Sequence, residues 1–389
     1  MMPARIALAA LFSLATAGPL AARESGSFVV RLGRDTTSVE RFTRAPGHVE
    51  VDQVGRAPRV LRRHFVYDFD ASGAMTRAAI TVTFPSAPAG APPVQQINAT
   101  FSADSALIEA RRDTVVTRTR AAVKAGAVVV SGTSPWVMYE RLAMQLVAQK
   151  ADTLGRPWYY IGAATGGWVT ARRLGRDSVE ITTTNLDRYH AQIDPTGHIL
   201  HVVPLHGTAK FTVDRVEKLD LEGIVSSFAG REQAAGQMGA LSTRDTVRAT
   251  AAGATLWIDY GRPAKRGRPI FGAVVVPYGE LWRTGANAAT QFRTDKTLRF
   301  GSSVLPAGMY TLWTIPSPGR WKLVVNRETG QWGTEHKGDQ DFLTLDMTVT
   351  ALTQPVERFT IGVSPTEAGG TLTLDWDTTR ASIPFTVEK

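Results

Sequence analysis

The sequence predicts a mainly β protein, in which an antiparallel sheet with one packed helix is followed by a β-sandwich. Hydrophobic and polar residues alternate through most of the chain, and Gly, Pro, Asn and Asp separate the alternating runs. Such alternation is typical of strands with one buried and one solvated face. A single stretch has helical periodicity instead. At 389 residues the chain is longer than one ordinary core requires, so we expect two domains.

Residues 1–22 have the pattern of a secretory signal peptide. A single basic residue, Arg5, precedes an apolar stretch from Ile6 to Leu14, and small residues follow. The apolar stretch is too short to span a bilayer, and the chain has no cysteine for lipid attachment. We therefore expect an exported bacterial protein, periplasmic or extracellular, without a transmembrane anchor.

Residues 24–230 are predicted to form an antiparallel β domain with one helix at about 135–150. The stretch is "SPWVMYERLAMQLVAQK", in which Ser134 is the expected N-cap and Pro135 the first helical residue. Apolar residues within it leave a polar side free. We therefore expect this helix to lie against the sheet.

Residues 231–245 are predicted to be a linker, and residues 246–389 a β-sandwich. The linker region is small and polar and has no periodicity, as in "AGREQAAGQMGALSTRD". The C-terminal region contains about eight alternating runs, among them "WKLVV" and "TLTLDWDT". That number of strands is sufficient for a sandwich.

Composition excludes several function classes. The chain has 44 Lys+Arg against 35 Asp+Glu, a formal charge of +9, but the basic residues are scattered rather than clustered, so nucleic-acid binding is not expected. The absence of cysteine removes disulfides and thiolate metal sites. Common hydrolase, zinc-protease and phosphate-loop motifs are absent. The sequence therefore identifies no catalytic residue and predicts no cofactor.

Two histidines form a candidate metal site. A hairpin turn at residues 194–197 would place Ile193 opposite His198, and the same register places His190 opposite His201. Cross-strand histidines can share a metal ion. A third ligand is not evident, since Asp194 belongs to the turn. Ordinary surface histidines are the alternative interpretation.

The C-terminal region resembles a known family. It contains, in order, "DYGRPAKRGRPIFGAVVVPYGELWRTGANAATQFRTDKTLRF", "LPAGMYTLWTIPSPGRWKLVVNRETGQWGTE" and "ERFTI…TLTLDWDTTRASIPFTV". These motifs, over about residues 246–389, resemble the bacterial family known as domain of unknown function 2911. The resemblance implies an exported β-rich domain and no established activity. Two positions depart from the family pattern, namely Ala288 in place of a glutamate and His336 in place of a tyrosine.

The same motifs supply a candidate ligand site. Three arginines are expected on loops or at a strand end, interleaved with aromatic residues. Arginine binds carboxylate or phosphate through paired hydrogen bonds, and aromatic faces stack on flat ligand surfaces. The candidate ligand-binding residues are Arg262, Arg268, Tyr278, Trp282, Arg283, Asn287 and Trp332. The alternative is that the arginines tie loops together and the tryptophans close the end of the sandwich.

We expect a non-catalytic binding module for a small anionic or glycan-like ligand. The alternative is a hydrolase acting on envelope or extracellular polymers, with a metal near His190 and His201. An interaction module without a small ligand is a third reading. Ala288 argues against acid–base chemistry in the segment around Asn287. Oligomeric state is not predicted.

Overall fold

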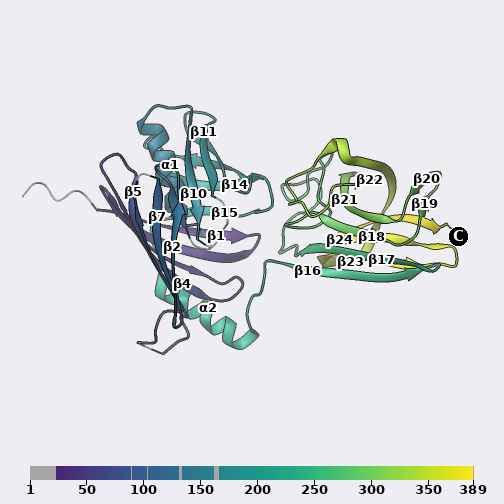
Figure 1. Cartoon of the computed structure of the whole chain (residues 1–389), viewed down its shortest axis with the longest axis horizontal. Coiled ribbons are helices and arrows are strands. Elements are labelled where there is room, and N and C mark those ends of the chain that lie inside the picture. The colour runs from purple at the N-terminus through teal and green to yellow at the C-terminus, as the bar shows by residue number, and fades with distance from the viewer. Residues whose placement is uncertain (1–22, 89, 103, 131–133, 162–165, 389) are drawn as a thin grey trace, which may run out of the picture.

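The computed structural model describes residues 23–88, 90–102, 104–130, 134–161 and 166–388. The predicted signal peptide, residues 1–22, lies outside them. The described strands form two separate sheets, one of 15 strands and one of nine, which lie at opposite ends of the long axis (Figure 1). The predicted fold class is confirmed: an antiparallel sheet with a packed helix is followed by a β-sandwich.

The first half of the N-terminal sheet is an antiparallel meander. Its strands neighbour one another in sequence order. They are β1 (Glu24–Leu32), β2 (Asp35–Ala45), β3 (His48–Gly55), β4 (Leu61–Phe69), β5 (Met75–Thr83), β6 (Gln95–Phe101), β7 (Ser105–Arg112) and β8 (Val115–Ala122).

The second half continues from β1 on its other side. Its strands are β9 (Val128–Val130), β10 (Thr153–Tyr160), β11 (Gly167–Arg173), β12 (Ser178–Thr182), β13 (Arg188–Ile193), β14 (Ile199–His206) and β15 (Thr212–Val216). The β1–β15 pairing joins the halves, with Val29 opposite Asp214. Every neighbouring pair is antiparallel except β9 and β10, which are parallel.

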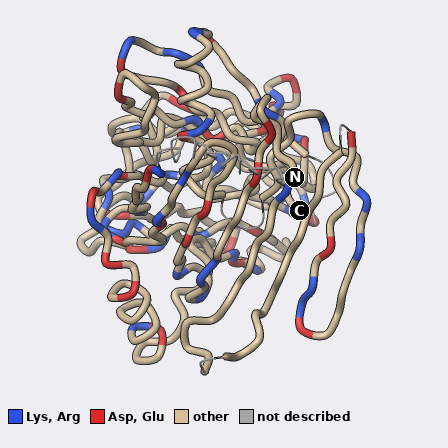
Figure 2. The backbone as a smooth tube through the Cα atoms, turned by 90° about the vertical axis from the view of Figure 1, so that its left-hand side faces the viewer, with Lys and Arg blue, Asp and Glu red and all other residues tan. Residues whose placement is uncertain are grey.

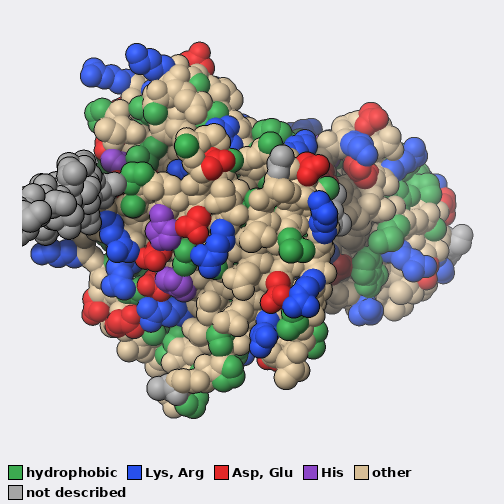
Figure 3. All heavy atoms as spheres, turned by 60° about the vertical axis from the view of Figure 1, so that its left-hand side comes forward, with side chains coloured by type: hydrophobic (Ala, Val, Ile, Leu, Met, Phe, Trp, Pro, Cys, Tyr) green, Lys and Arg blue, Asp and Glu red, His purple; other side chains and the backbone are tan. Residues whose placement is uncertain are grey.

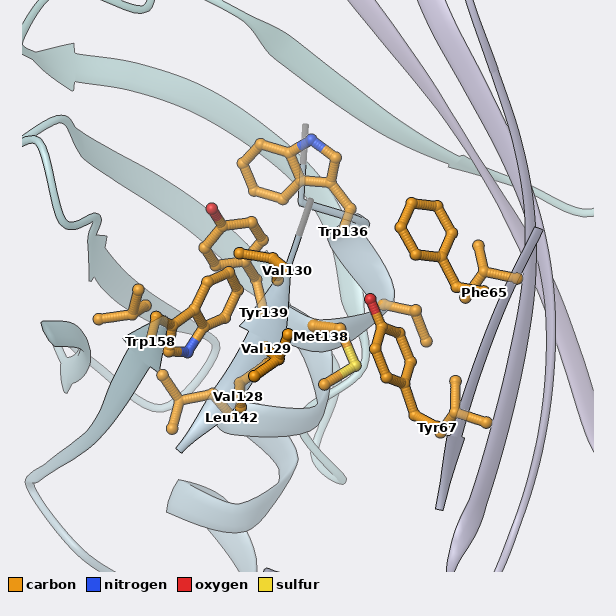
Figure 4. Close-up of a cluster of buried hydrophobic side chains, with 14 of the residues drawn as sticks. Phe65, Tyr67, Val128, Val129, Val130, Trp136, Met138, Tyr139, Leu142 and Trp158 are labelled. Atoms are coloured by element: carbon orange, nitrogen blue, oxygen red, sulfur yellow. The ribbon is translucent and has the colours of Figure 1, made fainter. Parts of the chain in front are cut away.

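Helix α1 (Trp136–Ala148) lies on the inner face of this sheet, as the sequence predicts. One hydrophobic core contains the buried side of α1 together with strands from both halves of the sheet, including Phe65 and Trp158. Figure 4 shows Tyr139 beside Trp158, and Phe65 and Tyr67 on the facing strands. The sheet therefore curves around the helix, because strands distant in the sheet pack on the same side chains.

The N-terminal end of α1 differs from the prediction. Pro135 is the N-cap residue, and Ser134 makes no capping bond. The carboxylate of Glu40 on β2 instead accepts the backbone N–H groups of Trp136 (3.0 Å) and Val137 (2.9 Å). Proline has no side-chain acceptor, so a carboxylate from the sheet satisfies the free donors of the first turn.

A second helix, α2 (Leu221–Ala235), occupies residues that the sequence suggested for the linker. Asp220 caps it by accepting the N–H of Gly223 at 2.9 Å. Leu221 and Phe228 pack on Val29 and other valines of the sheet's outer face. Of the predicted linker, residues 231–235 belong to α2 and residues 242–245 to β16, so regular structure occupies both of its ends. The helix was missed because few of its residues are apolar and buried.

The C-terminal sheet has the order β16-β17-β18-β21-β22-β23-β24-β19-β20. Its elements are β16 (Ser242–Ala251), β17 (Ala254–Pro263), β18 (Thr290–Thr294), β19 (Leu298–Phe300), β20 (Ser303–Leu305), β21 (Gly308–Ser317), β22 (Arg320–Asn326), the short 3₁₀ helix η1 (Gly338–Gln340), β23 (Asp341–Pro365) and β24 (Gly369–Val387). Register shifts in the β23–β24 pair bend these long strands. An isolated bridge between Ala264 and Arg358 brings the end of β17 to β23, so the sheet folds over its own core.

Contacts between the two sheets centre on the loop after β17. Arg266 forms an ion pair with Asp35, and the backbone N–H of Arg34 donates to the Arg266 carbonyl at 3.1 Å.

Basic and acidic residues are interspersed along the backbone in Figure 2. No helix in the part of the chain that the structure describes has the length and apolar character needed to cross a membrane.

Candidate functional site

A cavity of about 380 Å³ lies between the two sheets, and we term it the shared cavity. The N-terminal sheet lines it with Leu32, Ala57, Pro58 and residues 207–211. The chain between α2 and β16 and the first residue of β16 add residues 240–242, and the end of β17 adds Pro263. The remaining lining residues are Arg268, Val275, Trp282, Arg283, Gly285, Ala286, Asn287 and Trp376. Four of the seven predicted ligand-binding residues therefore meet at one cavity, namely Arg268, Trp282, Arg283 and Asn287.

Residues 281–290 form one wall, and we term them the arginine loop. Thr284 and Asn287 have φ values of 53° and 63°. Positive φ is unfavourable for a β-branched residue such as threonine, so surrounding contacts must hold this conformation. The Thr284 hydroxyl donates to the hydroxyl of Thr314 at 3.2 Å, and the Thr290 hydroxyl donates to the Thr284 carbonyl at 2.7 Å. The loop also packs on Gly261, where an added Cβ would lie 1.9 Å from the Ala286 carbonyl oxygen.

The arginine loop is fastened to a second motif segment around Gly333. Arg283 Nε donates to the Gly333 carbonyl at 2.9 Å, and the Gly333 N–H donates to the Asn287 carbonyl at 2.9 Å. A Cβ at Gly333 would lie 2.2 Å from Arg283 Cδ. Only glycine permits this close approach. The two motifs, separate in sequence, are thus one structural unit.

Arg283 also reaches the N-terminal sheet. Its Nη2 donates to the Gly207 carbonyl at 3.1 Å, in the loop between β14 and β15. Burial lowers the pKa of Arg283 to about 10, and the nearby Asp187 opposes this shift. The guanidinium remains charged at neutral pH. Arg283 therefore braces the loops and at the same time presents a positive charge to the cavity.

Lys210 is a second cation of the shared cavity, and it lies on the opposite wall. Burial, together with the charges of Arg283 and Arg268, lowers the pKa of Lys210 to about 8, and the charges of Asp187 and Glu280 oppose this shift. A lysine pKa falls when the ammonium loses water and faces other cations. The ammonium of Lys210 is therefore partly desolvated and is repelled by the positive charges of Arg268 and Arg283.

Arg268 is the third cation. Its Nε and Nη2 donate to the carbonyls of Lys265 (3.0 Å) and Ala264 (2.6 Å), which fix its loop. Burial lowers the pKa of Arg268 to about 10, with a contribution from the charge of Arg266. The guanidinium is thus held in place by backbone carbonyls, with no need of a carboxylate.

The three cations of the shared cavity differ from the neighbouring basic residues in whether they form ion pairs with carboxylates. Lys265 and Arg266 form ion pairs with Asp377 and Asp35. Among the residues that the structure describes, no carboxylate forms an ion pair with Lys210, Arg268 or Arg283. Buried charges are normally paired. Asp187 and Glu280 act on Lys210, and Asp187 on Arg283, without forming an ion pair, so among the described residues the positive charge of the shared cavity is only partly compensated.

Trp282 belongs to an aromatic cluster at the end of the sandwich. Its ring stacks on Trp376 with centroids 5.9 Å apart, and it meets Phe359 edge-on at 5.0 Å. The indole Nε1 donates to the Gly285 carbonyl at 3.1 Å. Trp282 is buried, so it closes the core and contributes only part of its surface to the cavity. The structural interpretation of this tryptophan, closing the end of the sandwich, is therefore confirmed, and its ligand-binding role stays a prediction.

Three other predicted ligand residues do not line the shared cavity. Arg262 donates to the Phe359 carbonyl, Thr360 and Asp245, so its hydrogen bonds brace strands. Tyr278 is 44% exposed, with its ring over Gly272. Trp332 is 37% exposed and forms a bridge with Ala288. These residues lie on strands or at the surface around the loop rather than against the cavity.

The predicted pairing of the two histidines was wrong. His190 lies opposite Val203, and His201 lies opposite Gln192, because the register shifts between Gln192 and Ile193. Ile193 pairs with Ile199, and not with His198. The Nδ1 atom of His201 contacts an Asp214 oxygen at 2.7 Å. Figure 3 shows that histidine side chains on one face of the molecule lie beside acidic and basic ones.

No group of three metal-binding side chains occurs within the described residues. No third ligand therefore joins His190 and His201 there. The ion pair of His201 with Asp214 is one expected of an ordinary surface histidine. His336 likewise contacts Asp341 at 2.8 Å and packs on Trp313, with ring centroids 4.9 Å apart.

Sequence reasoning missed Lys210 and Asp187. Asp187 Oδ1 accepts hydrogen bonds from the N–H of Ala209 at 3.0 Å, from the N–H of Thr208 and from the Thr208 hydroxyl at 3.1 Å. A Cβ on Gly207, which has a φ of 111°, would lie 2.2 Å from that oxygen. The run "HGTAK" shows a glycine turn before a lysine, but only the fold brings Lys210 to Arg283.

Comparison with known proteins supports the family resemblance. Residues 242–385 match the family model described as protein of unknown function, DUF2911. The N-terminal half has no family match. The comparison with curated proteins finds no match.

Two solved structures show similarity at low identity. One is the crystal structure of a DUF1089 family protein from Pseudomonas aeruginosa, with 11% identity and a TM-score of 0.29, covering 43% of this chain and 90% of that one. The other is a β-barrel-like protein of the domain of unknown function DUF1849 from Brucella abortus. It has 11% identity and a TM-score of 0.32, and covers 50% of this chain and 93% of that one.

Proposed function

We propose that this protein is a non-catalytic binding module that takes a small anionic ligand in the shared cavity. The observation that carries the proposal is the convergence of Lys210, Arg268 and Arg283 on one cavity without carboxylate partners. An anion bound there would compensate charges that are already partly desolvated. Electrostatic attraction is stronger in such a site than in bulk water.

Preorganisation supports the proposal. Backbone carbonyls hold the guanidiniums of Arg268 and Arg283, so neither has to be ordered when a ligand binds. Immobilising a flexible side chain on binding costs about 0.5–1.5 kcal/mol, which these contacts avoid. Asn287, also at the cavity, adds an amide that can hydrogen bond to a ligand oxygen.

The protein is further proposed to be exported. The support is the pattern of residues 1–22, with a basic start, a short apolar stretch and small residues. Sequencing the N-terminus of the protein recovered outside the cytoplasm tests this. A mature chain that still begins at Met1 would contradict it.

The binding proposal is tested by calorimetric titration of the full chain with inorganic phosphate. We expect saturable binding that weakens roughly ten- to hundred-fold in Lys210→Met, since a hydrogen bond between charged groups contributes about 1.5–3 kcal/mol. Lys210 makes no hydrogen bond to another described residue, so this change spares the fold better than changing Arg283 would.

The control is Lys322→Met, which makes the same change in net charge on exposed β22, where Lys322 lies 3.8 Å from Asp346. This variant should bind phosphate as the wild type does. Equal affinities of wild type and Lys210→Met would contradict the proposal, as would the absence of saturable binding to the wild type.

A further inference from the structure

A second cavity, of about 290 Å³, opens beside the shared cavity, and we term it the inner cavity. The two cavities have four lining residues in common, namely Ala57, Ala209, Phe211 and Leu241. The inner cavity lies within the N-terminal sheet, next to the N-terminal end of α1. The two cavities are therefore direct neighbours that share part of one wall.

The inner cavity contains buried polar groups without partners. Gln53 is 1% exposed, and its Oε1 has no hydrogen-bond donor in the described part of the chain. Thr183 Oγ1 is likewise buried and unpaired there. Both residues line the inner cavity, from strand β3 and from the loop after β12. Ser134 Oγ is a third such atom in the lining of this cavity. Leaving a buried polar group unpaired costs about 1–3 kcal/mol, and either water or the hydroxyl groups of a ligand can supply the missing hydrogen bonds.

Aromatic side chains form much of the remaining wall. Trp136, Tyr139, Tyr160 and Tyr189 line the cavity. The Trp136 and Tyr139 rings lie 4.9 Å apart, side by side at the start of α1 (Figure 4). Tyr189 meets Trp136 edge-on at 5.4 Å. Aromatic surface together with a few fixed polar groups is the usual lining of small-molecule sites and suits a ring with one apolar face.

The carboxylate of Asp187 would fix the orientation of such a ligand. It lines the inner cavity, is 4% exposed, and accepts its three hydrogen bonds through Oδ1. A carboxylate here accepts hydroxyl protons but repels an anion. Three cations line the shared cavity, namely Lys210, Arg268 and Arg283, whereas the inner cavity has one, Arg63, together with the carboxylate of Asp187. The anionic group of a ligand that spans both cavities would therefore lie toward Lys210, and its hydroxyl groups toward Asp187 and Gln53.

We propose that the ligand is a sugar ring that carries one anionic group, with the anion in the shared cavity and the ring in the inner cavity. This inference rests on the proposed function. Both candidate ligand classes have a polyhydroxylated ring, which is joined to a carboxylate in one class and to a phosphate in the other. Glucuronate and glucose 6-phosphate represent the two forms, and acetate and inorganic phosphate represent their anionic groups alone.

Calorimetric titration of the full chain with these four compounds tests the inference. We expect at least one sugar ligand to bind ten-fold or more tightly than its matched ion. Equal affinity within both pairs would overturn the inference while leaving phosphate binding, and hence the proposed function, intact. Absence of binding by all four compounds would overturn both.

Two variants locate the ring. Thr183→Val removes the unpaired hydroxyl at nearly constant volume, and the backbone bond from Thr183 N–H to the Asp187 carbonyl, at 2.9 Å, does not require that hydroxyl. We expect it to weaken the sugar ligand roughly three- to ten-fold, the range of one neutral hydrogen bond, and to leave the matched ion unchanged. Asn185→Ala, at an exposed position lining the cavity, is the second variant and should act in the same direction.

The matched control is Thr182→Val, one residue earlier on β12 and outside the cavity lining. It should bind both members of each pair as the wild type does. A loss of sugar affinity in Thr182→Val equal to that in Thr183→Val would overturn the placement of the ring, as would unchanged sugar affinity in both Thr183→Val and Asn185→Ala.

Discussion

Arg283 braces two loops and is also a residue that we propose to bind the ligand. Two of its nitrogens donate to the carbonyls of Gly333 and Gly207, one in each half of the molecule. Its charge meanwhile faces the shared cavity without a paired carboxylate among the described residues. Arginine can do both because its five donors point in several directions from one delocalised charge. Bracing and binding therefore do not exclude each other at this residue.

Lys210 gives the site a pH dependence. Its pKa of about 8 means that the ammonium loses its proton within one to two pH units above neutrality, whereas Arg268 and Arg283 keep theirs. An anion binds more tightly to the charged form. We expect phosphate affinity, measured by calorimetry, to fall as pH rises from about 7 to about 9.

The Lys210→Met variant is the reference for this prediction, because it lacks the titrating group. Its affinity should be lower than that of the wild type at pH 7 and should approach it at pH 9, after the phosphate's own ionisation near pH 6–7 is allowed for in both proteins. An identical pH profile in the two proteins would show that Lys210 does not contribute charge to the site.

At the scale of elements, α1 depends on a carboxylate that the sheet provides. Glu40 is fully buried and accepts two N–H groups at the start of the helix. Burial, together with the charge of Glu140, raises the pKa of Glu40 to about 7. The hydrogen bonds from Trp136 and Val137 oppose this shift. Glu140 differs in that Arg44 and Arg215 pair with it. The helix is thus sensitive to the protonation of one side chain.

This raised pKa predicts how stability varies with pH. The folded protein binds the Glu40 proton more tightly than the unfolded chain, so this contribution is fully present below about pH 4.5 and is lost as pH rises through about 7. The free energy of unfolding should fall by roughly 3 kcal/mol over that interval from Glu40 alone. Glu40→Gln, which keeps an acceptor oxygen but cannot ionise, should remove that fall.

Denaturant unfolding of wild type and Glu40→Gln between pH 4.5 and 7.5 measures the difference. Glu217→Gln, at an exposed position, is the control and should follow the wild-type curve. If the wild type and Glu40→Gln have parallel stability curves, Glu40 is not the titrating group at the helix N-terminus.

Helices could be predicted from the sequence where the hydrophobic periodicity was long and regular. Residues 135–150 place an apolar residue at nearly every helical turn, and α1 is found at Trp136–Ala148. Helix α2 was missed because its few buried residues, such as Leu221 and Phe228, lie among glycine, serine and alanine. The predicted register of the β13–β14 hairpin was wrong for two reasons. The turn is one residue longer than predicted, since Ile193 pairs with Ile199, and a bulge between Gln192 and Ile193 adds a second shift that leaves no mark in the alternation.

At the scale of the whole molecule, the site belongs to neither sheet alone. The C-terminal motifs supply Arg268, Arg283 and Asn287, and the N-terminal sheet supplies Lys210 on the facing wall. The motif residues could be identified from sequence because they occur in a contiguous, recognisable run. Lys210 could not be identified, because its role depends on how the β14–β15 loop meets the arginine loop, which no local pattern encodes. The same applies to Gln53 and Thr183 of the inner cavity.

The central claim is that the cations of both sheets hold one anion. The most direct test is a crystal structure of the full chain soaked with selenate, a tetrahedral dianion whose selenium is located by anomalous scattering. We expect an anomalous peak in the shared cavity, within hydrogen-bonding distance of Lys210 and of Arg268 or Arg283. Selenate ordered only elsewhere on the protein, with the shared cavity holding no peak, would contradict it.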